Sequence, residues 1–89
     1  MEIAYDPAKN ERNIRERGLS FERAADFDFA TARLTPVFRN NEDRMMATGY
    51  LDDRLHVLCY KDLESSRRII SFRKANEREA KLYGFKLRR

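Results

Sequence analysis

The chain has 89 residues, the size of a single domain. Hydrophobic residues make up 42% of the sequence, enough for a core, while charged residues make up 38%, well above the usual ~25%. No apolar run approaches the ~20 residues that span a bilayer, and the first residues lack the charge and apolarity of a signal peptide. We therefore predict a cytoplasmic globular domain with no membrane segment.

The content of cysteine and histidine, and the absence of certain motifs, exclude several kinds of site and enzyme class. Cys59 is the only cysteine, so no internal disulfide can form, and we expect it to be a small core residue. The sequence has no Cys/His cluster for zinc, no glycine-rich phosphate loop and no Gly-x-Ser-x-Gly motif. We therefore expect no metal and no cofactor, and neither an ATPase nor a serine hydrolase.

The charge is unevenly distributed along the chain, whose net charge is +4. Residues 1–60 carry 9 Lys and Arg against 11 Asp and Glu, a net charge of −2, whereas residues 61–89 carry 10 against 4, a net charge of +6. Such an asymmetry points to nucleic acid or an acidic protein as a partner. A solvated basic helix and tail would give the same composition without any partner.

The first residues predict a strand and a helix. Residues 2–5 have the composition of a short strand. Asp6 and Pro7 are a typical N-cap and first helical residue. The helix that they begin should run to Arg17, with Gly18 in the left-handed conformation after its end.

The next segment predicts a second helix and an edge strand. Ser20 is placed to cap a helix over residues 21–30, in which apolar residues recur at helical spacing. Residues 33–39 are predicted to form a short edge strand, because Pro36 argues against a central one.

From residue 44 the apolar period changes to two, which is typical of strands. Short turns separate three such segments, residues 44–51, 54–62 and 67–74, so they should form an antiparallel meander. Asn76 and Glu79 fit a capping box for a last helix over residues 76–85. The predicted fold is an α+β domain over residues 1–89: a small antiparallel sheet of three to four strands, with two N-terminal helices and one C-terminal helix on one face.

Alternation along the strands assigns side chains to two faces of the sheet. We place on the core face Leu55, Val57, Cys59, Ile70 and Phe72. The opposite face would then collect Arg44, His56, Tyr60, Ser71 and Arg73. Such a face can bind phosphates and stack bases, although the wet face of an antiparallel sheet needs no function.

These residue types can cut RNA without a metal. The 2′-hydroxyl attacks the adjacent phosphate, so the site needs a base, an acid and cations for the developing charge. The cation candidates are Arg44, Arg68, Lys74 and Arg73, of which alternation supports Arg73. The candidates for proton transfer are His56, Glu42, Tyr60 and Tyr83, although His56 can also be an ordinary hydrogen-bonded residue and Tyr83 a core-edge residue. The RNA-binding candidates are Lys9, Arg54, Tyr60, Arg68 and Ser71.

Several segments also match one known family at the family's own spacing. The first is DPAKNERNIRERGLSFERAADFDF at residues 6–29, which holds Lys9, Asn13 and Gly18. The others are EDR at residues 42–44, then Gly49 and Arg54, and finally RIISFRKANEREAKLY at residues 68–83. Together they cover nearly the whole chain and resemble the BrnT-type toxins. In two places the chain differs: Arg17 stands where the relatives carry histidine, and Phe72 where they carry alanine.

The resemblance implies the toxin half of a type II toxin–antitoxin pair. The implied fold is similar to the RelE-like ribonucleases, and the implied activity is RNA cleavage that inhibits translation. The implied partner is a ribbon-helix-helix antitoxin, with two toxins on an antitoxin dimer that also binds operator DNA. The alternative, which the absent histidine leaves open, is a non-catalytic module that binds an antitoxin or nucleic acid through its basic face.

Overall fold

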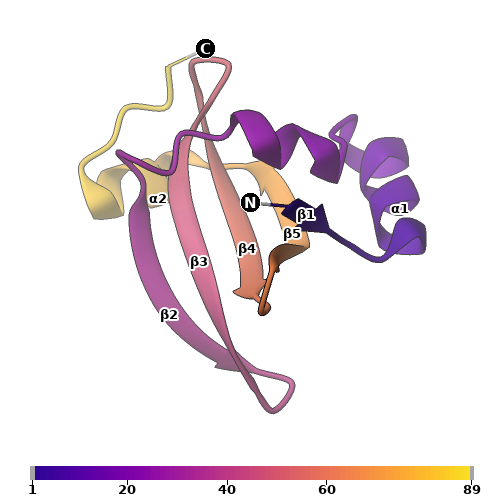
Figure 1. Cartoon of the computed structure of the whole chain (residues 1–89). Coiled ribbons are helices and arrows are strands. Elements are labelled where there is room, and N and C mark those ends of the chain that lie inside the picture. The colour runs from indigo at the N-terminus through magenta and orange to yellow at the C-terminus, as the bar shows by residue number, and fades with distance from the viewer. Residues whose placement is uncertain (1, 89) are drawn as a thin grey trace.

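The computed structural model describes residues 2–88 and contains a five-stranded sheet with helices (Figure 1). The strands are β1 (Glu2–Ala4), β2 (Arg33–Arg39), β3 (Glu42–Leu51), β4 (Arg54–Asp62) and β5 (Ser66–Lys74). The helices are α1 (Pro7–Arg17), the 3-10 helix η1 (Phe21–Asp26) and α2 (Glu77–Tyr83). The predicted α+β class is confirmed.

The sheet is mixed, which corrects the prediction of a purely antiparallel one. Its strand order is β1-β5-β4-β3-β2. Strands β2 to β5 form the predicted meander, each antiparallel to the next, and β2 lies at the edge as Pro36 indicated. β1 pairs with β5 in parallel, with Ile3 opposite Arg67. A three-residue strand carries no signal for the strand that it will join, so this pairing could not be predicted.

The ends of α1 and α2 follow the predicted capping signals. The Asp6 carboxylate accepts a hydrogen bond from the N–H of Ala8 at 3.0 Å, and Gly18 ends α1 with a φ of 64°. The capping box of Asn76 and Glu79 is present, and Gly84 ends α2 in the same left-handed conformation. Of the helices in residues 2–88, none has both the length and the apolarity to cross a bilayer.

The second predicted helix is shorter than expected. It forms only the 3-10 helix η1, because Phe27 already has extended backbone angles. Beyond it, the Asp28 carboxylate accepts hydrogen bonds from the N–H of Ala30 at 3.1 Å and the hydroxyl of Thr31 at 2.6 Å. Aspartate favours such local turns over a continuing helix, so the helical spacing of residues 21–29 was misleading.

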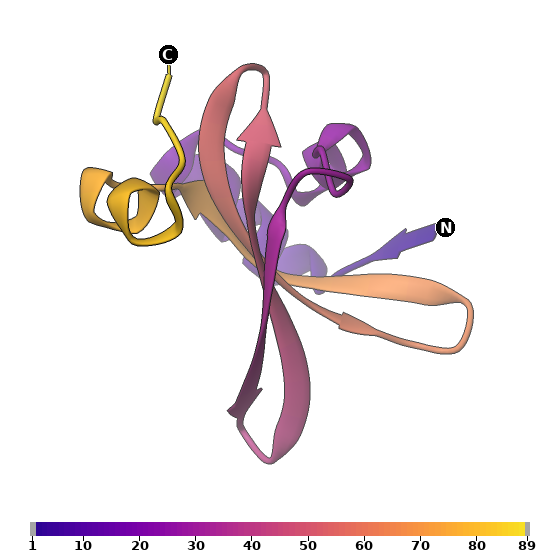
Figure 2. The same ribbon diagram turned by 90° about the vertical axis from the view of Figure 1, so that its left-hand side faces the viewer.

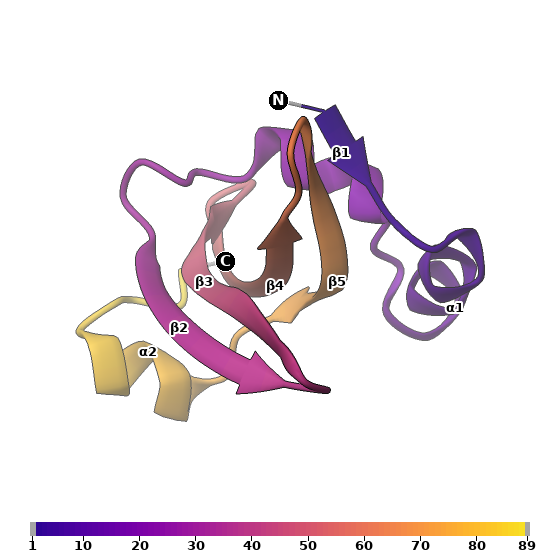
Figure 3. The same ribbon diagram turned by 60° about the horizontal axis from the view of Figure 1, so that its bottom comes forward.

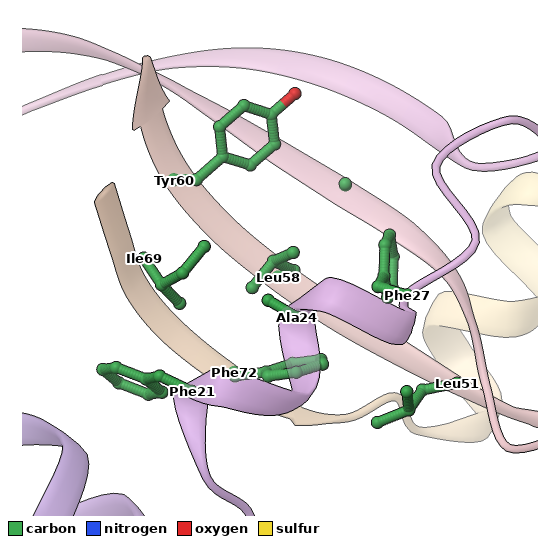
Figure 4. Close-up of a cluster of buried hydrophobic side chains, with 9 residues drawn as sticks. Phe21, Ala24, Phe27, Leu51, Leu58, Tyr60, Ile69 and Phe72 are labelled. Carbon is green, nitrogen blue, oxygen red and sulfur yellow. The ribbon is translucent and has the colours of Figure 1, made fainter. Parts of the chain in front are cut away.

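Helices cover both faces of the sheet, which corrects the prediction that they lie on one face. Figure 2 shows α2 and η1 on opposite sides of the β3–β4 hairpin, and Figure 3 shows how strongly the sheet curves. On the η1 side, Leu58 and Phe72 pack against Phe21 and Phe27 (Figure 4). On the α2 side, the buried residues are Leu55, Val57, Ala75 and Ala80. β4 is therefore buried on both faces, and its alternation does not separate core from solvent.

An irregularity in β5 moves further residues between the faces. The register shifts after the Cys59–Ser71 pair, because Tyr60 lies opposite Ile69 and Ile70 is passed over. Ile69 and Phe72 both enter the core on the η1 side. Ile70, which alternation assigned to the core, is only half-buried. Phe72 is buried as predicted, but on the face opposite to Leu55 and Val57.

Two buried asparagines fasten α1 to the rest of the fold. The Asn13 amide donates hydrogen bonds to the carbonyl oxygens of Leu19, at 2.8 Å, and Phe72, at 2.9 Å. The Asn10 side-chain oxygen accepts one from the N–H of Phe21 at 2.7 Å. The polar helix α1 is therefore held by amide–backbone bonds as much as by apolar contact.

We expect Asn13→Ala to lower the free energy of unfolding by about 1–3 kcal/mol, because it leaves two carbonyl oxygens without their donor. Urea denaturation measures this loss. Lys9→Ala, at an exposed position of the same helix, is the matched control and should change stability by less than about 0.5 kcal/mol. Equal stability of the two variants would show that the Asn13 bonds do not hold α1.

Candidate functional site

Most of the predicted site residues, joined by Glu79, fall into two groups on opposite sides of the sheet. We call the group on the α2 side the basic face; it consists of Glu42, Arg44, Arg68, Ser71, Arg73 and Glu79. The other group, Arg54, His56 and Lys74, lies at the end of the sheet nearest η1 and α1. Lys9 is exposed on α1 and lines no cavity with either group.

One end of the basic face is a carboxylate shared by two arginines. Oε2 of Glu42 accepts hydrogen bonds from Nε of Arg44 and from a terminal nitrogen of Arg68, each at 2.7 Å. The bond from Arg44 is the main reason why the pKa of Glu42 lies below its usual value. The Arg44 side chain is only 10% exposed, so its guanidinium is firmly positioned. Glu42 therefore stays charged at neutral pH and fixes both arginines.

The other end of the basic face is the ion pair of Arg73 with Glu79. Both terminal nitrogens of Arg73 donate to the Glu79 carboxylate, each at 2.8 Å. The same carboxylate accepts a hydrogen bond from the N–H of Asn76 at 3.0 Å, which ties it to the start of α2. The sequence indicated Glu79 only as a capping residue. Its second role, as the partner that orients Arg73, depends on how α2 folds back on β5.

A row of small and uncharged side chains lies between the two ends. Ser71 pairs with Cys59, and Cys59 pairs with Met46. Cys59 is half-buried rather than fully in the core, and burial raises the pKa of its thiol. Arg68 and Arg73 are five positions apart on β5, which separates them by roughly 15 Å at ~3.3 Å per residue. The basic face is therefore long enough for more than one phosphate.

Tyr83 lies beside the basic face on α2, four residues after Glu79. This spacing puts the two side chains on the same face of the helix. Tyr83 is half-buried, and the Arg33 guanidinium lies 5.2 Å from the centre of its ring.

The prediction that His56 and Tyr60 point to the same open face as Arg44 and Arg73 is wrong. Tyr60 is buried in the core on the η1 side (Figure 4), where the Arg67 guanidinium lies 4.1 Å from the ring centre. His56 is 5% exposed, and its Nδ1 lies 2.7 Å from the carbonyl oxygen of Arg54. Burial, with the neighbouring charges of Arg54 and Lys74, lowers the pKa of His56.

Two arginines that were not among the candidate site residues lie near His56; the resemblance had marked Arg17 only as the residue in place of a histidine. Arg17 and Arg23 line the same cavity as Arg54, His56 and Lys74. Nothing in the local pattern of α1 or η1 marks these two residues, because their proximity to β4 and β5 arises only in the folded chain. The candidate site therefore has a basic face and a cationic cavity, which share Arg73. Within residues 2–88, no cluster of His, Cys, Asp and Glu is placed to hold a metal ion.

The two glutamates of the basic face should make the fold sensitive to acid. The pKa values of Glu42 and Glu79 are lowered chiefly by hydrogen bonds from Arg44 and Arg73 respectively. The folded state thus binds fewer protons, and this stabilisation is complete above the unfolded pKa of about 4.3 and is lost as the pH falls through the lower folded values. We expect Glu79→Gln to flatten the loss of stability below about pH 4.3, as measured by urea denaturation at a series of pH values.

Glu77→Gln, an exposed change on the same helix, is the matched control for that series. It should keep the pH profile of the unchanged protein. The same profile for Glu79→Gln as for the unchanged protein would mean that the ion pair with Arg73 does not contribute to stability.

Comparison with known proteins agrees with the resemblance. The sequence model of a family described as "Ribonuclease toxin, BrnT, of type II toxin-antitoxin system" matches residues 5–79, a range that includes α1, η1, β2 to β5 and the start of α2 but not β1. No curated protein and no solved structure gives a significant match, so the likeness to RelE-like ribonucleases stays a prediction. The chain belongs to the BrnT family of ribonuclease toxins of type II toxin–antitoxin systems.

Proposed function

We propose that the chain is an endoribonuclease that cuts RNA on the basic face without a metal ion. The observation that supports this most is the presence on one face of three arginines that glutamates hold in place. Guanidinium groups bind phosphate oxygens bidentately and remain charged, so arginines in fixed positions suit a developing phosphorane. These arginines are Arg44, Arg68 and Arg73.

In the proposed reaction, the 2′-hydroxyl of RNA attacks the adjacent phosphorus and passes its proton to solvent water, and the bond from phosphorus to the 5′-oxygen breaks as that oxygen takes up a proton. The products are a 2′,3′-cyclic phosphate and a 5′-hydroxyl. Arg73 binds the attacked phosphate, and Tyr83, on the same face of α2 as Glu79, donates the proton to the leaving oxygen. Glu42 and Glu79 act as positioning residues, because their carboxylate oxygens are bonded to the arginines that they orient.

The proposed biological role follows from the family. Cleavage of RNA in the cytoplasm inhibits translation, and a ribbon-helix-helix antitoxin neutralises the toxin, with two toxins bound to one antitoxin dimer. Operator DNA would be bound only through the antitoxin. The chain itself supplies the basic surplus of its last third, which suits both RNA and an acidic surface of the antitoxin.

Purified protein should cleave RNA as fast in excess EDTA as in magnesium, because arginines rather than a metal ion stabilise the transition state. Gel electrophoresis of a short labelled RNA measures the rate, and the cyclic phosphate can be detected by its resistance to a phosphomonoesterase. A rate that vanishes in EDTA and returns with magnesium would contradict the metal-free mechanism.

A second candidate is a toxin that binds without cutting. Arg17 occupies the place where relatives carry histidine, and the one histidine of the chain, His56, lies outside the basic face. Full-length RNA after long incubation, together with tight binding of that RNA or of the antitoxin, would favour this candidate.

A further inference from the structure

The cavity near His56 is built from four separate parts of the fold. It has a volume of about 690 Å³ and lies where α1 ends, beside η1, at the start of β4 and the end of β5. Each of these elements contributes at least one cation. The charged residues that line it are Arg17, Arg23, Asp52, Arg54, Arg73 and Lys74. Five cations against one carboxylate give the cavity a formal charge of +4 with His56 neutral.

Two of these cations have no acidic partner. Within residues 2–88, no carboxylate oxygen lies within 4 Å of a charged nitrogen of Arg17 or Lys74. Arg17 is held by a bond to the Asn13 side-chain oxygen at 3.1 Å. Arg23, by contrast, pairs with Asp52 at 2.8 Å. Cations held close together without counter-charges repel one another, so an anion in the cavity would be stabilised.

The shape and composition of the cavity favour phosphate over carboxylate. Its cations approach from several directions, which suits an anion with several oxygens in a tetrahedral arrangement. Leu19 and Leu51 form an apolar part of the cavity lining, against which a ribose or a base can pack. Arg73 lines this cavity and also belongs to the basic face, so an RNA chain bound on the basic face can continue past Arg73 into the cavity.

We propose that the cavity formed by Arg17, Arg54, His56 and Lys74 is a second phosphate subsite, which binds an RNA phosphate next to the one that is cleaved. The identity of the anion as RNA rests on the proposed function; the existence of an anion site does not. The imidazole of His56 borders the bound phosphate and, because its Nδ1 lies against the Arg54 carbonyl oxygen, it presents Nε2 as its other polar atom.

His56 is the only histidine, so its imidazole proton signals report on this cavity alone in a one-dimensional NMR titration. The probes are adenosine 5′-monophosphate and a tetranucleotide with 2′-O-methyl riboses, which the protein cannot cleave. We expect both probes to shift the His56 signals and to raise its pKa, since a nearby anion stabilises the imidazolium ion. The charged groups that face the cavity are the same with and without the probe, so a change in the His56 pKa reports the bound anion. These groups are Arg17, Arg23, Asp52, Arg54, Arg73 and Lys74.

Arg17→Ala and Lys74→Ala should each weaken the binding of the tetranucleotide about tenfold, as loss of one charge-assisted hydrogen bond does. Both residues are exposed, so the variants should stay folded, as signal dispersion in the same spectra will show. The matched controls are Arg15→Ala on α1 and Arg78→Ala on α2, which remove one exposed positive charge each outside the cavity. They should bind within about twofold of the unchanged protein.

The inference is overturned if the His56 signals do not respond to either probe, or if the cavity variants and the controls lose affinity equally. A hexaglutamate peptide that shifts the His56 signals at lower concentration than the tetranucleotide would also overturn it, and would assign the cavity to an acidic segment of a partner protein. A normal His56 response in a protein that does not cleave RNA would instead refute the proposed function and leave the anion site standing.

Discussion

Replacing Arg73 by alanine is expected to slow RNA cleavage by about 100- to 1,000-fold, the usual cost of removing one group that stabilises transition-state charge. Of the five N–H donors of the guanidinium, two bind Glu79 and one binds the carbonyl oxygen of Lys74, so two remain for a phosphate. A single-turnover assay on a short RNA measures the effect.

Two further substitutions separate charge from position at this residue. Arg73→Lys keeps the positive charge but cannot form the two-bond pair with Glu79, so its rate should lie between those of the unchanged protein and Arg73→Ala. Arg78→Ala removes an exposed arginine on α2 and should leave the rate unchanged. Full activity of a folded Arg73→Ala protein would mean that the basic face is not the site of cleavage.

Phe72→Ala should lower the free energy of unfolding by about 3–5 kcal/mol, the usual range for a buried phenylalanine. Phe72 is 0% exposed, and its ring lies edge-to-face against Phe27 at 6.0 Å and His56 at 5.6 Å. Domains are stable by only about 5–15 kcal/mol, so the variant should be close to unfolding at room temperature. Urea denaturation followed by circular dichroism measures the loss.

The comparison with Leu82→Ala tests whether burial is the cause. Leu82 is 71% exposed, so its loss should change stability by less than about 0.5 kcal/mol. The result for Phe72→Ala is informative because the BrnT-type pattern that the sequence resembles has alanine at this position. A variant as stable as the unchanged protein would show that η1 repacks over the smaller side chain.

The parts of the fold that depend on neighbouring residues could be predicted from the sequence. Asp6, Gly18 and Asn76 have the expected capping geometry, because each cap is formed by residues within four positions of it. The meander of β3 to β5 also followed from period-two spacing and short turns. The parallel pairing of β1 and the position of η1 depend on contacts far along the chain, and alternation says nothing about them.

The faces of the strands were assigned wrongly for a specific physical reason. Alternation along a strand distinguishes a buried face from a solvent-exposed face only when one face of the sheet is exposed. In β4, Val57 and Leu58 point to opposite faces and both are buried, under different helices. In β5, Ile70 has no partner on β4, so the face to which each side chain points is shifted by one residue between Ser71 and Ile69. His56 and Tyr60 were consequently expected beside Arg73.

The arginines of the basic face could be placed together even though the core residues of the strands were assigned to the wrong faces. Arg44, Ser71 and Arg73 lie on one side of the sheet as expected, because β3 and β4 pair without a shift and the irregularity in β5 begins only at Ile70. The glutamates that orient the arginines were visible in the sequence, but only the folded chain shows which arginine each contacts.

The glutamates of the basic face also bear on how strongly salt should weaken the attraction of RNA. Binding of single-stranded RNA normally gains free energy from the release of condensed counterions. The slope of the logarithm of the binding constant against the logarithm of the salt concentration becomes steeper by about 0.7 for each phosphate neutralised. Arg44, Arg68 and Arg73 already have carboxylates beside them, so each offers a phosphate less than a full positive charge. We therefore expect the basic face to select a ligand by geometry and to bind polyanions in general more weakly than its count of arginines implies.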